Sequence, residues 1–90
     1  MGSRRSKLEI IYDMLKSIQE KNGRIKPTHL LYKSNLSYNK MKDYLDELLK
    51  NQMILEEKTK DGTHYTLTDN GVKFINDFKR IKEFSDSFGL

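Results

Sequence analysis

The chain has 90 residues, no cysteine, and a net charge of +4 from 17 Lys and Arg against 13 Asp and Glu. This length suits one domain, and a domain of this size hides only about 60 to 65% of its unfolded surface, which leaves little room for an enclosed cofactor cavity. The lack of cysteine excludes disulfides and thiolate metal sites, and no apolar run is long enough to span a membrane or act as a secretory signal. We therefore expect a cytoplasmic protein with no membrane partner and no cofactor.

Basic charge is concentrated in the first third of the chain. Residues 1–24 hold six Lys or Arg against three acidic residues, and residues 25–36 add two lysines and no acid. The remaining residues hold nine basic and ten acidic side chains. Any binding of phosphate groups should therefore use the N-terminus and the segment after residue 25 as well as later elements. A basic N-terminus is also compatible with a simple solubilising tail.

The first segment is predicted to be a helix over about 7–21. Ser6 followed by Glu9 is a capping box, in which each side chain accepts a hydrogen bond from the other residue's backbone amide. Asn22-Gly23 supplies a left-handed stop at the other end. Between them runs a broad apolar stripe with helical spacing, formed by Leu8, Ile10, Ile11, Met14, Leu15 and Ile18.

A short strand at Ile25 and a short helix over about 28–34 are expected next. Pro27 sets φ for the first turn of this helix. Ser34-Asn35 then turns the chain, and Leu36 is expected to plug the core as a hydrophobic staple at the start of the following helix.

The third helix, which we expect to be capped by Ser37 and to run to about Lys50, is the most informative element. Apolar spacing predicts an inward face of Met41, Leu45, Leu48 and Leu49, which leaves outward Tyr38, Asn39, Lys42 and Asp46. Two lysines lie early, at 40 and 42, and the acidic residues lie later, which is the reverse of what the helix macrodipole prefers. Each misplaced charge costs about 0.3 to 1 kcal/mol at most. This order indicates an N-terminal end suited to a negative partner, and it also fits a solvated face with scattered charge.

After Asn51, a plausible helix C-cap, the pattern changes to a β-hairpin with arms at 53–58 and 63–67. The side chains expected to face the helices are Ile54, Tyr65 and Leu67, and those expected to point outward or lie at the sheet edge are Glu56, Lys58 and His64. Thr68 then caps a final helix over about 69–87.

Three helices, a hairpin and a last helix follow one another in the order αααββα. The chain is predicted to be mainly α with a small β-hairpin, an α+β fold of the winged helix-turn-helix type with Lys60-Asp61-Gly62 at the tip of the wing. We expect one structural domain, in which residues 1–68 form a winged-helix DNA-binding core and residues 69–90 form a C-terminal helix that packs on the core and dimerises.

Catalysis has strict requirements that this sequence does not meet. His29 and His64 are 35 residues apart with no metal-ligand spacing nearby, and no glycine-rich phosphate loop follows a strand. The carboxylates of Asp43, Asp46 and Glu47 share an exposed helix with lysines, so we interpret them as solvated charge that would repel phosphates from the C-terminal half of that helix. We predict no enzyme, no metal site and no small-molecule ligand.

Four sequence words carry a resemblance to a known family. SKLEII (6–11), NLSY (35–38), YLDELL (44–49) and YTLTDNG (65–71) resemble those of small archaeal winged-helix DNA-binding proteins, which include chromatin-associated members and transcription regulators. The resemblance covers nearly the whole chain. It implies double-stranded DNA as ligand, the third helix in the major groove, the wing near the minor groove or backbone, and dimerisation through the last helix as an antiparallel coiled coil. The last helix is shorter here than in the chromatin-type members.

Candidate DNA contacts divide into base readout and backbone positioning. For the bases we nominate Tyr38, Asn39 and Lys42, with the alternative that Asn39 merely satisfies amides at the helix start. For the backbone we nominate Thr28, Lys33, Ser37 and Lys40, with Lys60 at the wing tip. Arg4 and Arg5 are predicted to follow the minor groove as a flexible arm.

The last helix carries an unusually long apolar face. Five of its side chains are predicted to lie on that face, namely Phe74, Phe78, Ile81, Phe84 and Phe88. They extend over about 14 residues, or roughly 20 Å, and a domain of this size covers only the first half of that length. A helix that simply packs back across the first helix needs fewer apolar residues, so we predict a homodimer through this face.

Two functions remain open at this point. The first is double-stranded DNA binding by a dimeric, nucleoid-associated transcription regulator or small chromatin-associated protein. The second is a winged-helix protein–protein interaction module within a larger complex that does not bind DNA, because the charges of residues 37–53 sum to about zero.

Overall fold

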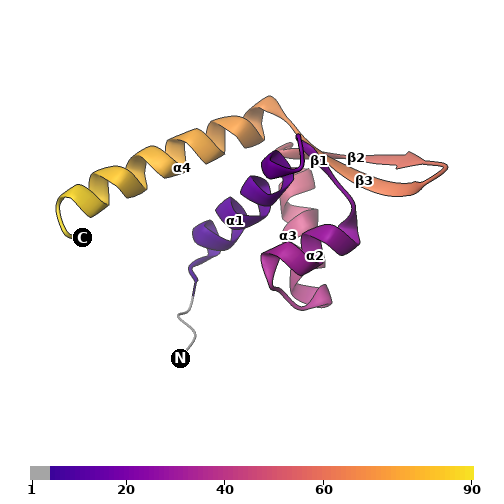
Figure 1. The fold of residues 1–90 in the computed structure, drawn as a ribbon, viewed down its shortest axis with the longest axis horizontal. Coiled ribbons are helices and arrows are strands. Elements are labelled where there is room, and N and C mark those ends of the chain that lie inside the picture. Colours follow the sequence, from indigo (N-terminus) through magenta and orange to yellow (C-terminus); the bar gives the residue numbers. More distant parts are fainter. Residues whose placement is uncertain (1–4) are drawn as a thin grey trace.

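The computed structural model describes residues 5–90, and its elements follow the predicted order (Figure 1). They are α1 (Lys7–Glu20), β1 (Arg24–Ile25), α2 (Pro27–Ser34), α3 (Tyr38–Lys50), β2 (Ile54–Thr59), β3 (Gly62–Leu67) and α4 (Asp69–Ser87). The β2–β3 hairpin and the C-terminal half of α4 project from opposite ends of the molecule, which measures 49 × 32 × 21 Å. The predicted α+β winged-helix fold is confirmed.

Three helices begin at the side-chain caps that the sequence predicted. The hydroxyls of Ser6, Ser37 and Thr68 each accept a hydrogen bond from the backbone amide three residues later. The box at α1 is reciprocal, because the Ser6 amide donates to Glu9 Oε1 at 2.9 Å. α2 differs, since it begins at Pro27 and no side chain caps its N-terminus.

Left-handed residues follow the first three helices. Asn22 (φ 62°) and Gly23 (φ 85°) follow α1, and Asn35 (φ 55°) follows α2. Asn51 is the C-cap of α3 as expected, but the residue with left-handed geometry is the next one, Gln52 (φ 57°). These tight turns let each helix pack directly against the element that follows it.

β3 lies at the centre of a three-stranded antiparallel sheet, with β1 and β2 on its two sides. β2 pairs Ile54 with Leu67, and the short β1 pairs Ile25 with Tyr65. All four side chains pack into or against the hydrophobic core. The sheet therefore closes the core on the side opposite the helices.

Glu56 and Lys58 are exposed, as expected, but they do not point away from α3. Alternate residues of a strand share one face, so both side chains lie on the same face as Ile54, toward α3. They remain exposed because the hairpin extends beyond the helices. His64 points to the other face, as predicted, where its ring lies near Arg24.

The core is built mainly by α1 and α3. Its fully buried side chains from these helices are Met14, Leu15, Ile18 and Leu48, with Met41 and Leu45 nearly so. Leu49 is only half-buried, so the inward face of α3 is narrower than expected. The expectation that Leu8 belongs to the buried stripe is wrong, because this first-turn residue is 52% exposed.

α4 is held to the core by its first half. Phe74 packs on the core, and the Phe78 ring lies against Tyr12 with centroids 4.9 Å apart. Farther along, Lys82 reaches Glu9 of α1 at 3.9 Å. The remaining apolar residues of the predicted dimer face are about two thirds exposed: Ile81 (67%), Phe84 (65%) and Phe88 (66%).

Candidate nucleic-acid interface

The N-terminal half of α3 presents its predicted readout residues to solvent. Met41 and Leu45 are buried in the core, and this fixes the rotation of the helix about its axis. Tyr38, Asn39 and Lys42 all remain exposed, and Tyr38 and Lys42 lie beside Met41 and Leu45 along one groove. The prediction that these three side chains face outward is confirmed.

A groove lies between α3 and the hairpin, and we call it the recognition groove. It has a volume of about 400 Å³ and its polar lining consists of Tyr38, Lys42 and Asp46 from α3 and Glu56, Lys58, Thr63 and Tyr65 from the hairpin. Pro27, at the start of α2, forms part of its wall. One face of α3, the wing and the start of α2 thus meet around one concave surface.

The charges inside the recognition groove balance one another. Lys42 and Lys58 line it together with Asp46 and Glu56. The Tyr65 hydroxyl donates to Glu56 Oε2 at 3.4 Å, and burial, followed by the Glu56 charge, raises the pKa of Tyr65. Tyr65 therefore stays neutral at physiological pH, and the attraction for a negative partner must come from outside the groove.

Exposed Lys40 and the first turn of α2 supply that attraction, and both lie within an acid-free run of the sequence. Residues 21–42 contain six Lys or Arg and no Asp or Glu, and they form β1, α2, the turn and the start of α3. The first turn of α2 also lacks acidic residues and a side-chain cap, so its free amides add partial positive charge. The part of the chain that contributes the exposed end of α3 is also its most positive part.

The other nominated backbone contacts lie in different surroundings. Ser37 and Lys40 sit at the exposed start of α3, and Thr28 is exposed in the first turn of α2. Lys60 is exposed at the tip of the wing. Lys33 differs, because its ammonium lies 3.5 Å from the Glu20 carboxylate and so already has a partner.

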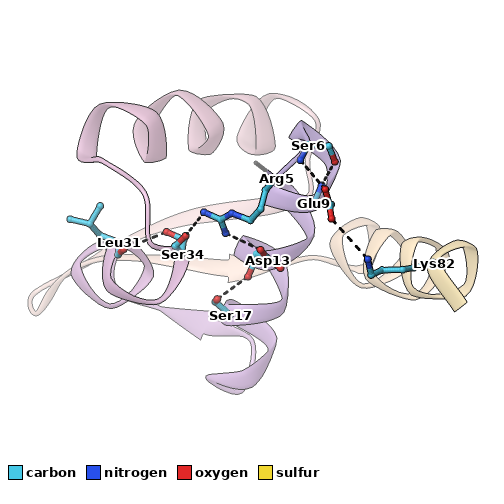
Figure 2. A network of polar contacts seen from close by, with 8 residues as sticks. All are labelled: Arg5, Ser6, Glu9, Asp13, Ser17, Leu31, Ser34 and Lys82. Carbon is cyan, nitrogen blue, oxygen red and sulfur yellow. Dashed lines mark hydrogen bonds and ion pairs between the residues drawn. The ribbon is translucent and has the colours of Figure 1, made fainter. Parts of the chain in front are cut away.

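The predicted minor-groove arm does not have the expected form at Arg5, and Arg4 lies outside the described residues. Figure 2 shows the Arg5 guanidinium directed into the molecule, where it donates to Asp13 Oδ2 at 2.8 Å and to the Ser34 carbonyl at 2.9 Å. Ser17 Oγ donates to the Asp13 carbonyl at 2.8 Å in the same network. Arg5 therefore joins α1 to the end of α2 instead of extending toward a ligand.

Sequence reasoning missed Lys58 and Thr63, which lie opposite each other in the hairpin and line the recognition groove. The signal was present in the strand alternation, because Ile54 is buried and Lys58 lies four residues later on the same face.

Among residues 5–90, no three side chains of His, Asp or Glu form a group that would hold a metal ion. Over that same range, no helix combines the length and apolarity of a membrane span.

Comparison with known proteins gives a family match over almost the whole chain. The winged helix-turn-helix family matches residues 4–86. An uncharacterised protein of Methanocaldococcus jannaschii is 35% identical over 78 residues, which are 87% of this chain. The chain spans only 34% of the length of that relative.

Solved structures show the same fold at lower identity. Sso10a-2, a DNA-binding protein from Sulfolobus solfataricus, superposes with a TM-score of 0.82 at 20% identity, over 93% of this chain and 85% of that one. TubR from Bacillus thuringiensis serovar israelensis, solved with 24 bp of tubC, has a TM-score of 0.68 at 23% identity, over 79% of this chain and 80% of its own. At these identities the likeness establishes the fold.

Proposed function

The chain belongs to the winged helix-turn-helix family, and on this premise we propose that it binds double-stranded DNA as a dimeric transcription regulator or small chromatin-associated protein. One observation carries the proposal: the exposed end of α3 lies beside the recognition groove, within the acid-free run of residues 21–42. Sso10a-2 is described as a DNA-binding protein and TubR was solved with a duplex, which supports the same role for this fold here. Membership of the winged helix-turn-helix family also agrees with the prediction that the chain is not an enzyme.

In the proposed complex α3 enters the major groove, whose width of about 12 Å accepts one helix. Tyr38, Asn39 and Lys42 then face base edges, and an asparagine side chain pairs with adenine through two hydrogen bonds. Ser37, Lys40 and Thr28 lie where they can donate to phosphates at the rim. The acidic residues later in α3 keep the C-terminal half of the helix away from the backbone.

The wing supplies the second contact. Lys60 at its tip and Lys58 on its α3-facing side are both exposed. A duplex held by α3 places the neighbouring backbone against this side of the hairpin. Lys33 contributes less to the complex, because its ammonium must first give up Glu20.

Dimerisation uses the uncovered end of α4. We call the exposed surface formed by Ile81, Phe84 and Phe88 the apolar patch. Large exposed apolar patches on a small domain mark interaction sites. A second copy of the chain, related by a two-fold axis, covers the apolar patch with its own. The resulting dimer presents two α3 helices to an extended DNA site. Residues 1–68 thus carry the DNA contacts and residues 69–90 carry the dimer contact.

Selection from a random duplex pool at two salt concentrations tests the proposal. We expect affinity to fall steeply with added salt because counterions are released, and an enriched motif identifies a regulator whereas unenriched binding identifies an architectural protein. Asn39→Ala with Lys42→Ala should weaken binding at low salt, while Lys79→Ala, on the exposed surface of α4, should not.

The balanced charge of the recognition groove favours one rival function, a module that binds another protein. That rival predicts no duplex affinity even at low salt. Such a result for the wild-type chain, with the fold intact by circular dichroism, would refute the DNA-binding proposal.

A further inference from the structure

A second basic surface lies on the other face of the hairpin, and we call it the outer hollow. It has a volume of about 560 Å³ and is lined by Lys21, Asn22, Arg24, Ile25, Lys26, His29 and His64. These residues come from the turn after α1, from β1, from the start of α2 and from β3. The fold therefore brings together five basic or imidazole side chains that are spread over 44 residues of sequence.

The outer hollow and the recognition groove face different directions. Thr63 and Tyr65 line the groove, and His64 between them lines the hollow, because successive side chains of a strand point to opposite faces. At the start of α2, Pro27 belongs to the groove and its neighbour Lys26 belongs to the hollow. A ligand seated in one site is thus separated from the other by the hairpin itself.

The charge of the outer hollow is positive with little compensation. Glu57 reaches it and pairs with Arg24 at 2.9 Å, and the Arg24 guanidinium also lies 3.4 Å from His64 Nδ1. Lys21 and Lys26 are exposed, and within residues 5–90 neither forms an ion pair. The uncapped N-terminus of α2 opens beside Lys26 and adds partial positive charge.

We propose that the outer hollow binds the phosphate backbone of a second DNA duplex while the recognition groove holds the first. This inference rests on the proposed DNA-binding function. Among the residues that line the hollow there is no Phe, Tyr or Trp, so it lacks the large stacking platforms that single-stranded nucleic acids use. A duplex has a persistence length of about 150 bp, so one short segment cannot turn around the hairpin to occupy both faces without a large bending cost.

A two-duplex capture assay tests the inference. One duplex is immobilised and loaded with protein, and retention of a second, labelled duplex is measured. The double variant Lys21→Ala/Lys26→Ala should bind the first duplex within about twofold of wild type but lose on the order of tenfold in capture of the second, with a salt slope lower by about two. Lys73→Ala/Lys79→Ala, which removes the same charge from exposed positions on α4, should behave like wild type in both steps.

Three outcomes overturn the inference. Equal loss in both steps would mean that the outer hollow belongs to the same interface as the groove. Unchanged capture by Lys21→Ala/Lys26→Ala, with loss only in Asn39→Ala/Lys42→Ala, would mean that a dimer joins two duplexes through its two copies of α3. If the wild type binds no duplex at all, the proposed function fails and this inference fails with it, whereas the first two outcomes leave the proposed function standing.

Discussion

Replacement of Phe84 by alanine should dissociate the dimer without unfolding the protomer. Phe84 is 65% exposed in the isolated chain, so it contributes little to the stability of the fold. An aromatic side chain buries about 150 to 250 Å² in all, so full coverage of this exposed fraction removes roughly 100 to 160 Å² from water. At about 25 cal/mol for each Å², that burial is worth about 2.5 to 4 kcal/mol for each protomer.

Two-fold symmetry doubles the effect, because the same substitution occurs on both copies of α4. The upper limit is therefore about 5 to 8 kcal/mol for each dimer, and coverage of about half the ring gives about 3 kcal/mol. A loss of about 3 kcal/mol corresponds to a rise of more than a hundredfold in the dimer Kd. The melting temperature of the monomer should stay nearly constant, since exposed substitutions usually change stability by less than about 0.5 kcal/mol.

Sedimentation equilibrium over a range of micromolar concentrations measures this effect directly. The matched control is Leu55→Ala, which removes a similarly exposed apolar side chain (58%) from β2, whereas the apolar patch lies at the C-terminal end of α4. We expect a dimer for wild type and Leu55→Ala, and a 10.7 kDa species for Phe84→Ala. A wild-type chain that sediments as a monomer, or a Phe84→Ala dimer as tight as wild type, would refute the role assigned to the patch.

Three further predictions concern local features of the fold. Gly71→Ala should lower stability by about 1 to 3 kcal/mol in urea denaturation, because an added Cβ would contact the Met53 carbonyl oxygen, a backbone atom that cannot rotate away; unchanged stability would contradict this packing. Ser37→Asp should keep the helix cap and hence the melting temperature, yet weaken duplex binding because it places a negative charge beside the proposed phosphate contact. The control is Ser37→Asn, a neutral cap, which should bind like wild type. Equal binding by both variants would remove this residue from the interface. The Ser6 amide and hydroxyl hold the pKa of the Glu9 carboxyl below its ordinary value, so the stability that this charge contributes is present above the ordinary pKa and is lost as pH falls through the lowered value of the folded state. Thermal melts from pH 7 to pH 3 should therefore show a smaller acid-induced loss of stability for Glu9→Gln than for wild type. Parallel curves for the two proteins would rule out this contribution.

The recognition residues illustrate how far the sequence leads toward the site. The helical spacing of Met41 and Leu45 already predicts that Tyr38 and Lys42 point away from the core, because the faces of a helix depend only on its own period. The spacing contains no information on what lies opposite those residues. Lys58 joins the same groove only because the hairpin folds back toward α3.

Local chemistry in the sequence by itself determined the order and limits of the elements. Caps such as Ser6 and Ser37 and the left-handed Asn22 act on their immediate neighbours, so their effects can be predicted without knowledge of the fold. The predicted assignment of all four helices and the hairpin depends on such short-range interactions and is confirmed within one or two residues.

Only the tertiary structure decided which side chains meet across those elements. Arg5 binds Asp13 and the end of α2, although its place in a basic terminus favoured a free arm. Leu8 lies within an apolar stripe, yet the other helices leave it 52% exposed. Likewise the outer hollow exists only because strand pairing brings His64 next to Arg24. Such contacts depend on the relative placement of segments distant in the chain, and no periodicity within one segment encodes that placement.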